Sequence, residues 1–316
     1  MTTQDDLKRA VAQVAGERAS VRLDGEGRAG VVLDGTGLTA DARGTLEQRV
    51  RAAAALPGVT AVRVVVTAER VTRQLVAVAS GKGGVGKSTL AANLAIALKR
   101  GGRRVGLVDA DIYGPSQPRL MGVEGTRPTA HDKRLDPVST PAGVPLLSMG
   151  QLVAPGKAIA WRGPMTAGAL GQLIDADWGV TDTLVVDLPP GTGDVQLTMI
   201  QKHRPAGAVI VSTPQDLALI DATRAIDLFQ AAGVPIIGLV ENMAGYACPH
   251  CGEVSDPFGQ GGAEAAARAL GIPFLGRVPL TIAIREASDA GQPPALGDDA
   301  VFAPIAARVA EWLATN

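Results

Sequence analysis

Residues 80–89 read SGKGGVGKST, which is the strongest indication of the fold in this chain. It fits the spacing G-x-x-x-x-G-K-[ST] of a phosphate-binding loop, in which glycines allow successive backbone N–H groups to turn toward phosphate oxygens. Lys87 adds a positive charge, and Ser88 is placed to give its hydroxyl to Mg²⁺. The residues expected to bind the nucleotide here are Gly81, Lys82, Gly83, Gly84, Val85, Gly86, Lys87, Ser88 and Thr89.

The sequence on both sides of the loop provides the strand and the helix that such a loop requires. Residues 73–79 read RQLVAVA, an almost continuous apolar run typical of a parallel strand buried on both faces. Residues 87–100 are rich in helix formers, and two glycines follow as a stop signal. Residues 104–109 form a second apolar run. The pattern predicts a βαβ unit built around the loop.

Carboxylates follow two of the predicted strands, as a Mg²⁺–nucleotide site requires. Asp109 and Asp111 come directly after the apolar run VGLV, and Asp187 ends the run TLVVD. Ligands bind beyond the carboxyl ends of the strands in an open α/β sheet, so we expect these side chains and the phosphate loop to meet in one crevice. Unpaired carboxylates at strand ends seldom serve packing, because they are costly to bury.

The only two cysteines of the chain are Cys248 and Cys251, in the order Cys-Pro-His-Cys. A tetrahedral metal or cluster site takes four ligands, and one chain provides two thiolates. Two chains related by a two-fold axis provide four, which suits a [4Fe–4S] cluster or a zinc ion between them. An intrachain redox disulfide is a third interpretation, although no thioredoxin-like unit is visible around the motif. The spacing leaves all three interpretations open.

The rest of the chain predicts an α/β fold with a doubly wound, mainly parallel sheet, preceded by a small α+β domain. Apolar strands and helices alternate after the loop to the C-terminus, which is the rhythm of such a sheet. Residues 122–145 are polar and rich in Pro, Thr and Asp, and we expect a loop there. Two helices and three short strands are expected before the loop. We therefore divide the chain into residues 1–70 and 71–316, and the predicted N-terminal elements are helices at 4–15 and 42–56 and strands at 20–23, 30–33 and 59–66.

The composition argues against a nucleic-acid or membrane partner. The formal net charge is −1 and aromatic residues make up 3% of the chain, so neither a strong positive field nor many stacking platforms are present. No run approaches the ~20 apolar residues of a membrane helix, and the first ten residues contain no apolar signal region. Two cysteines kept as free thiols or metal ligands suit a reducing compartment, so we expect a cytoplasmic protein.

The motifs together resemble one family over residues 74–280. They are SGKGGVGKST, DADIYGPSQP at 109–118, WRGPM at 161–165, VVDLPPGTGD at 185–194, VSTPQDLALID at 211–221 and ENMAGYACPHCG at 241–252. This series resembles the Mrp/ApbC group of P-loop ATPases, which are iron–sulfur cluster carrier proteins. The loop with its extra lysine looks like the deviant Walker A loop of the wider class of MinD, ParA and nitrogenase iron protein. The N-terminal segment resembles, in a divergent form without cysteine, the small domain that precedes the ATPase in bacterial members.

The resemblance implies roles for individual residues. Lys82 is equivalent to the lysine that crosses the dimer interface to the nucleotide of the partner, and it is expected to be catalytic together with Lys87 and Asp111. Asp111 would orient or deprotonate the attacking water. Asp187 would be the Walker B aspartate that, with Ser88, holds Mg²⁺. Asp109 is expected either to support the site or to have a structural role. Asn242, expected just after a predicted strand at 236–240, and Pro279 would contact the adenine base.

The resemblance also implies a function for the whole chain. It implies a homodimer that holds a [4Fe–4S] cluster between its subunits through Cys248 and Cys251. The cluster would pass to apo iron–sulfur proteins, with a cluster-assembly scaffold as a further partner. Binding of ATP and its slow, dimer-coupled, Mg²⁺-dependent hydrolysis would regulate the transfer.

Two other functions compete with this one. A partitioning or positioning ATPase would keep the same loop but would use a basic DNA-binding face or a membrane anchor, and it would have no use for the two cysteines. The apolar stripe of residues 300–314 contains Arg308 as its only basic residue, so we expect that helix to pack on its own domain rather than on a membrane. A zinc-bridged ATPase scaffold is the other alternative, and metal analysis would separate it.

Overall fold

The computed structural model describes residues 2–38, 40–67, 72–131, 133–152, 163–297 and 300–316. These residues form two compact units. The first contains residues 1–72 with 131–136 and 177–181, and the second contains the remainder. Trp161 and Arg162 of the WRGPM motif lie outside the described residues.

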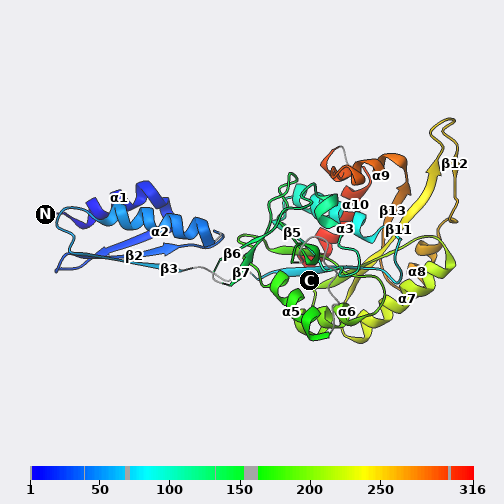
Figure 1. Cartoon of the computed structure of the whole chain (residues 1–316), viewed down its shortest axis with the longest axis horizontal. Coiled ribbons are helices and arrows are strands. Elements are labelled where there is room, and N and C mark those ends of the chain that lie inside the picture. The colour runs from blue at the N-terminus through cyan, green and yellow to red at the C-terminus, as the bar shows by residue number, and fades with distance from the viewer. Residues whose placement is uncertain (1, 39, 68–71, 132, 153–162, 298–299) are drawn as a thin grey trace. The chain divides into compact units, whose positions relative to one another are not determined.

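The N-terminal unit is a three-stranded sheet with two helices on one face (Figure 1). Residues of β2 alternate between the two faces: Val31 and Leu33 are buried against the helices, whereas Val32 is exposed. β1 pairs antiparallel with β2, and β3 pairs parallel with it. The predicted helices and strands of this region are confirmed, and their bounds are α1 Gln4–Ala15, β1 Ala19–Leu23, β2 Arg28–Asp34, α2 Ala40–Ala54 and β3 Ala61–Thr67.

The second unit contains the predicted parallel sheet. Among the described residues it has eight strands, in the order β12-β11-β10-β4-β9-β5-β8, with β13 beside β11. All pairs are parallel except β11 with β12. The strands are β4 Gln74–Ala79, β5 Val105–Asp109, β8 Leu146–Ser148, β9 Thr183–Asp187, β10 Gly207–Ser212, β11 Ile236–Ala247, β12 Val254–Ser255 and β13 Phe274–Leu280.

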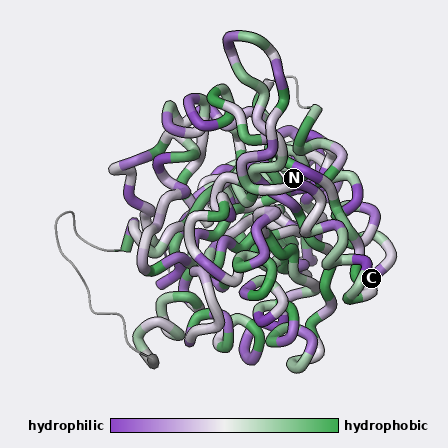
Figure 2. Tube along the Cα trace, turned by 90° about the vertical axis from the view of Figure 1, so that its right-hand side faces the viewer, coloured by the Kyte–Doolittle hydropathy of each residue, from purple (hydrophilic) through white to green (hydrophobic). Residues whose placement is uncertain are grey.

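Helices cover both faces of this sheet, with α3 and α10 on one side and α5, α6 and α7 on the other (Figure 1). The central strands are therefore buried throughout, which explains their continuous apolar sequences. Figure 2 shows apolar segments concentrated in the interior. The helices are α3 Lys87–Arg100, α4 Gln117–Leu120, α5 Gly163–Ile174, α6 Asp194–Thr198, α7 Asp216–Ala231, α8 Gly262–Leu270, α9 Ile282–Asp289 and α10 Phe302–Thr315.

The C-terminal helix packs on its own unit, as expected. Phe302, Ile305 and Val309 of α10 are buried in the core cluster that also contains the apolar residues of α3. Its apolar stripe is therefore covered by protein.

The structure corrects two expectations. Residues 122–145 are not only a loop, because they contain the short paired strands β6 Thr129–His131 and β7 Arg134–Asp136. Asn242 does not follow its strand but lies inside β11, because β13 pairs alongside and extends the ladder to Asn242↔Val278 and beyond. Strand β11 then continues into a hairpin with β12.

Candidate nucleotide and thiolate sites

The phosphate loop connects β4 to α3 at the centre of the sheet, and its glycines are required by their surroundings. A Cβ on Gly81 would lie 2.0 Å from the carbonyl carbon of Asp221 in α7. A Cβ on Gly86 would lie 2.0 Å from Nδ2 of Asn242, and Gly86 also has φ +81°. Only glycine therefore fits at these two positions.

The loop presents free backbone donors. Among the described residues, no acceptor receives a hydrogen bond from the N–H groups of Gly83, Gly84 or Val85. A Cβ on Gly84 would have nothing within 4 Å, so space is open beside these donors. Such a cradle of N–H groups at the start of a helix suits the oxygens of a polyphosphate.

Lys87 lies at the edge of the sheet where strands β4, β5 and β9 end. Its ammonium Nζ is 2.5 Å from Oδ1 of Asp187, 3.6 Å from Oδ2 of Asp111 and 3.3 Å from Oγ of Ser88. The side chains of Lys87 and Asp187 are 6% and 0% exposed. The structure thus brings together the lysine, the hydroxyl and both carboxylates that the sequence singled out, and the ammonium offsets part of the negative charge of the carboxylates.

Asp111 is held by its own loop. Its Oδ1 accepts hydrogen bonds from the backbone N–H groups of Tyr113 and Gly114, at 3.0 and 3.2 Å. Its Oδ2 faces Lys87. One oxygen is therefore fixed, and the other is directed toward the site.

Asp109 is fully buried behind these groups. Burial and the nearby Asp187 raise the pKa of Asp109 to about 7, against the opposing effect of three hydrogen bonds. The donors are the backbone N–H groups of Gln117 and Asp111 and the hydroxyl of Ser148. Asp109 thus ties β5, β8 and α4 together.

Two buried glutamines were missed by the sequence analysis. Gln117 donates through Nε2 to Oδ2 of Asp187 and to the carbonyl of Ser88. Gln196 donates through Nε2 to the carbonyls of Pro189 and Gly191, which follow Asp187. Both glutamines lie in or beside quoted motifs, but a glutamine in a polar motif gives no sign that it will be buried.

Lys82, Asn242 and Pro279 are also predicted to contact the nucleotide, and they differ in burial and in hydrogen-bond partners. Lys82 is half-buried, and its ammonium has no hydrogen-bond or ion-pair partner among the described residues. Asn242 is 9% exposed and donates through Nδ2 to the carbonyl of Val85, at 2.7 Å. Pro279 is half-buried in β13, which pairs with the strand of Asn242. Asn242 therefore braces the phosphate loop, and Pro279 lies on the neighbouring strand.

Cys248 and Cys251 lie at the tip of the β11–β12 hairpin, which projects from the unit in both views (Figure 1, Figure 2). Cys248 is half-buried and Cys251 is exposed, and both are free thiols. Backbone N–H groups of Cys251 and His250 donate to the sulfur of Cys248 and lower the pKa of its thiol. The turn is closed by hydrogen bonds from Cys248 N to the Glu253 carbonyl and from Gly252 N to the Cys248 carbonyl. The hairpin thus favours a thiolate at Cys248.

The family described as the ParA-type NUBPL iron-transfer P-loop NTPase matches residues 71–313. The chain belongs to this family. Within the family, an iron-sulfur cluster carrier protein of Pseudomonas fragi is 51% identical over 228 residues, which are 72% of this chain and 79% of the relative. One of the same name from Methanocaldococcus jannaschii is 47% identical over 226 residues, 71% and 78% of the two chains.

Two solved structures are similar to this chain and support the same fold. A nucleotide-binding protein from Archaeoglobus fulgidus, in complex with ADP, is 40% identical with a TM-score of 0.61, over 69% of this chain and 86% of that one. The cell division ATPase MinD of Pyrococcus furiosus is 24% identical with a TM-score of 0.53, over 76% and 99% of the two chains. The second likeness supports the fold alone: an α/β P-loop NTPase fold of the MinD/ParA type, as predicted.

None of the helices that the structure describes has the length and apolar character needed to span a membrane. Within the described residues of this one chain, no group of three or more His, Cys, Asp or Glu side chains is arranged to hold a metal ion.

Proposed function

We propose that the chain is an iron–sulfur cluster carrier in which ATP binding and hydrolysis regulate the cluster. The observation that supports this most is the pair of free thiols on a projecting hairpin of the same unit that contains the phosphate loop. A nucleotide switch alone has no chemical use for Cys248 and Cys251. The names of the relatives, which are iron-sulfur cluster carrier proteins, support the same function.

The cargo would be a [4Fe–4S] cluster shared by two copies of the chain. Four thiolates complete such a site, and a two-fold axis near the hairpin tips would bring two from each copy. N–H donors to the Cys248 sulfur favour the thiolate that binds iron. The homodimer would receive the cluster from an assembly scaffold and transfer it to apo iron–sulfur proteins. Free thiols of this kind fit the reducing conditions of the cytoplasm, where we place the protein.

The nucleotide site would use the buried side chains in separate roles. The hydroxyl of Ser88 and, through water, the carboxylate of Asp187 are hard oxygen donors that suit Mg²⁺. When bound, Mg²⁺ would neutralise negative charge on the β- and γ-phosphates. Lys87 would leave the carboxylates for the phosphates, and Asp111 Oδ2 would then be available to accept a proton from the attacking water. Attack on the γ-phosphorus would release ADP and inorganic phosphate.

Hydrolysis would depend on the dimer through Lys82. Its ammonium has no partner among the described residues of its own chain, although it stands in the phosphate loop. We propose that it reaches the nucleotide of the second copy and stabilises transition-state charge there. Such an arrangement would make hydrolysis slow in the monomer. Asn242 and Pro279 would contact the adenine base beside the loop.

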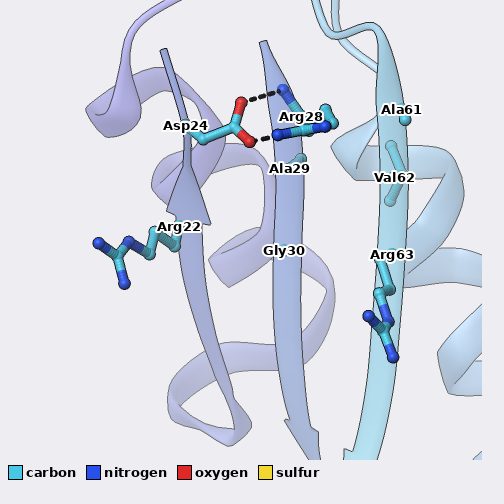
Figure 3. A pocket seen from close by; sticks show the side chains of 8 residues that line it. All are labelled: Arg22, Asp24, Arg28, Ala29, Gly30, Ala61, Val62 and Arg63. Atoms are coloured by element: carbon cyan, nitrogen blue, oxygen red, sulfur yellow. Dashed lines mark hydrogen bonds and ion pairs between the residues drawn. The ribbon is translucent and has the colours of Figure 1, made fainter. Parts of the chain in front are cut away.

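The N-terminal unit, proposed as a separate domain of residues 1–70, would dock partner proteins. Its open sheet face contains a cavity of about 650 Å³, drawn in Figure 3, in which Arg22 and Arg63 lie on either side of Gly30. Neither arginine has a hydrogen-bond or ion-pair partner among the described residues, whereas Arg28 is paired with Asp24. Two unpaired guanidinium groups favour an acidic segment of a recipient protein.

Metal analysis tests the carrier function. Wild-type protein and the Cys248→Ala variant would be reconstituted anaerobically with iron and sulfide, and iron, sulfide, zinc, visible absorption and solution mass would be measured. We expect about four irons and four sulfides per dimer in the wild type and none in the variant. The matched control is His250→Ala, which changes the same turn but removes no thiol. One zinc per dimer that iron does not replace would instead support the zinc-bridged scaffold.

A further inference from the structure

Gln117 occupies a central place in the nucleotide site although the proposed chemistry gives it no role. It lies at the start of α4 and is 0% exposed. Its Nε2 donates to Oδ2 of Asp187 at 2.8 Å and to the backbone carbonyl of Ser88 at 2.9 Å. The two hydrogens of one amide thus join the carboxyl end of β9 to the first turn of α3. These are the two segments that supply the proposed Mg²⁺ ligands.

The orientation of this amide is determined by its partners. Both atoms that it contacts are acceptors, so a flipped amide would place Oε1 against a carboxylate and a carbonyl. As it stands, Oε1 is buried and receives no hydrogen bond from the described residues. A buried polar atom without a partner is unfavourable, so the two contacts of Nε2 must outweigh it.

The contact also determines how Asp187 faces the site. With Oδ2 engaged by Gln117, Oδ1 is the oxygen directed at the Lys87 ammonium. If Lys87 moves to the phosphates, the amide of Gln117 remains as the donor that keeps the Asp187 carboxylate in this orientation. The same amide holds the backbone carbonyl of Ser88, so the first turn of α3 and the Asp187 carboxylate keep a fixed relative position.

We propose that Gln117 is a positioning residue that couples Mg²⁺ to nucleotide binding, because it holds Asp187 and the first turn of α3 in a fixed relative position. The inference rests on the proposed Mg²⁺–nucleotide site. Groups that orient metal ligands typically contribute about ten- to a hundredfold to metal affinity. Gln117 itself touches neither the metal nor the substrate in this arrangement.

The test measures binding of a fluorescent ADP analogue with Mg²⁺ and with EDTA. The ratio of the dissociation constant in EDTA to the dissociation constant with Mg²⁺ reports how strongly Mg²⁺ is coupled to nucleotide binding. For Gln117→Met, which keeps the length but removes both donors, we expect this ratio to fall by about tenfold or more. Binding in EDTA should change little. The backbone N–H of residue 117 still donates to Asp109 in the variant, so only the two amide contacts are removed.

Gln196→Met is the matched control. Gln196 is also a buried glutamine with an unpartnered Oε1, but its Nε2 contacts two backbone carbonyls and no proposed Mg²⁺ ligand. Its variant should weaken binding equally with and without Mg²⁺, leaving the ratio unchanged. If Gln117→Met does not fold, Gln117→Asn keeps a polar amide but shortens the side chain by one methylene, so the amide cannot reach both Asp187 and the Ser88 carbonyl and the ratio should again fall.

The outcomes separate this inference from the proposed function. A wild-type protein whose affinity for the analogue is the same with Mg²⁺ and with EDTA would contradict the Mg²⁺–nucleotide site itself. A wild type with strong coupling and a folded Gln117 variant with the same ratio would overturn the role of Gln117 alone. An equal fall of this ratio in the Gln196→Met variant would also overturn the role of Gln117, because any buried glutamine near the site would then have the same effect.

Discussion

The nucleotide site and the cysteine hairpin differ in how much of each site one chain builds. Lys87, Asp111 and Asp187 are at most 10% exposed, and each contacts groups from neighbouring strands or loops. Cys248 and Cys251 lie on a turn that is closed only by its own backbone, and Cys251 is exposed. The first site is positioned by the core before any ligand arrives. The second offers two thiolates, and in the proposed function a second copy would provide the others.

This difference implies that the two sites fail independently. Substitutions in the first site should affect stability and hydrolysis together, because the site is part of the core. Substitutions in the second should affect only what the thiols bind.

Lys87→Ala should give the largest loss. It leaves two buried carboxylates without their cation, which costs about 3–5 kcal/mol in comparable buried pairs, and it removes the phosphate contact. We expect ATP hydrolysis to fall by more than about a hundredfold and the midpoint of urea unfolding to fall, whereas the iron content of the folded fraction should be retained. Lys82→Ala is the control: it should lose hydrolysis without losing stability. A Lys87→Ala protein that hydrolysed ATP like the parent would contradict the assigned site.

Cys248→Ala and Cys251→Ala should show the reverse pattern. Iron binding should be lost, because two thiolates per dimer cannot replace four. The turn keeps its backbone hydrogen bonds, so the free energy of unfolding of the apo-protein should change by no more than about 0.5 kcal/mol. Hydrolysis by the apo-dimer should be unaffected. Variants that still assembled and transferred a cluster at the parental rate would contradict the carrier function.

Gly81→Ala and Gly84→Ala form a pair that measures how tightly the loop is packed. The new Cβ at position 81 would overlap the backbone of α7, so we expect a loss of about 3 kcal/mol or more and no nucleotide binding. The new Cβ at position 84 would meet open space, and only the left-handed backbone (φ +79°) would cost about 1–2 kcal/mol. Chemical denaturation and nucleotide binding of both variants check this. Equal losses would mean that the loop is not held against α7.

Asp109→Asn should change the pH dependence of stability. The pKa of Asp109 is raised to about 7 in the folded protein from an ordinary value of 3.8, so the folded state binds more protons than the unfolded state between these values. Stability contributed by this group is present at low pH and is lost as pH rises toward 7. The variant, measured without nucleotide, should lose stability less steeply between pH 5 and about 7. An unchanged slope would show that Asp109 is ionised throughout.

Arg22→Ala and Arg63→Ala should have the smallest effects. Exposed charge pairs contribute about 0.2–1 kcal/mol, so affinity for an acidic recipient protein should fall by about 1.4- to fivefold for each arginine. The loss should disappear at high salt, and hydrolysis should be unchanged. Arg28→Ala, whose arginine is already paired with Asp24, is the control. An equal loss of affinity in all three variants would indicate a general effect of positive charge rather than binding of the recipient protein between Arg22 and Arg63.

Much of the fold could be predicted because the decisive signals are local. The helix at 87–100 and the strand at 183–187 have the predicted bounds, since apolar runs and glycine stops act within one element. The phosphate loop and the carboxylates at the ends of β5 and β9 were also identified, because parallel strands necessarily bring their carboxyl ends to one edge. The length of β11 was not predicted, since it depends on pairing with β13, which follows it in the chain.

The family, the phosphate loop, the acidic residues and the thiol pair could all be identified from the sequence, because each is a short pattern with its own chemistry. Which atoms meet became known only from the folded chain. It placed Lys87 between Asp187 and Asp111, and it buried Gln117 against both proposed Mg²⁺ segments. Burial and hydrogen-bond partners depend on the packing of elements distant in the sequence, and no local pattern contains that information.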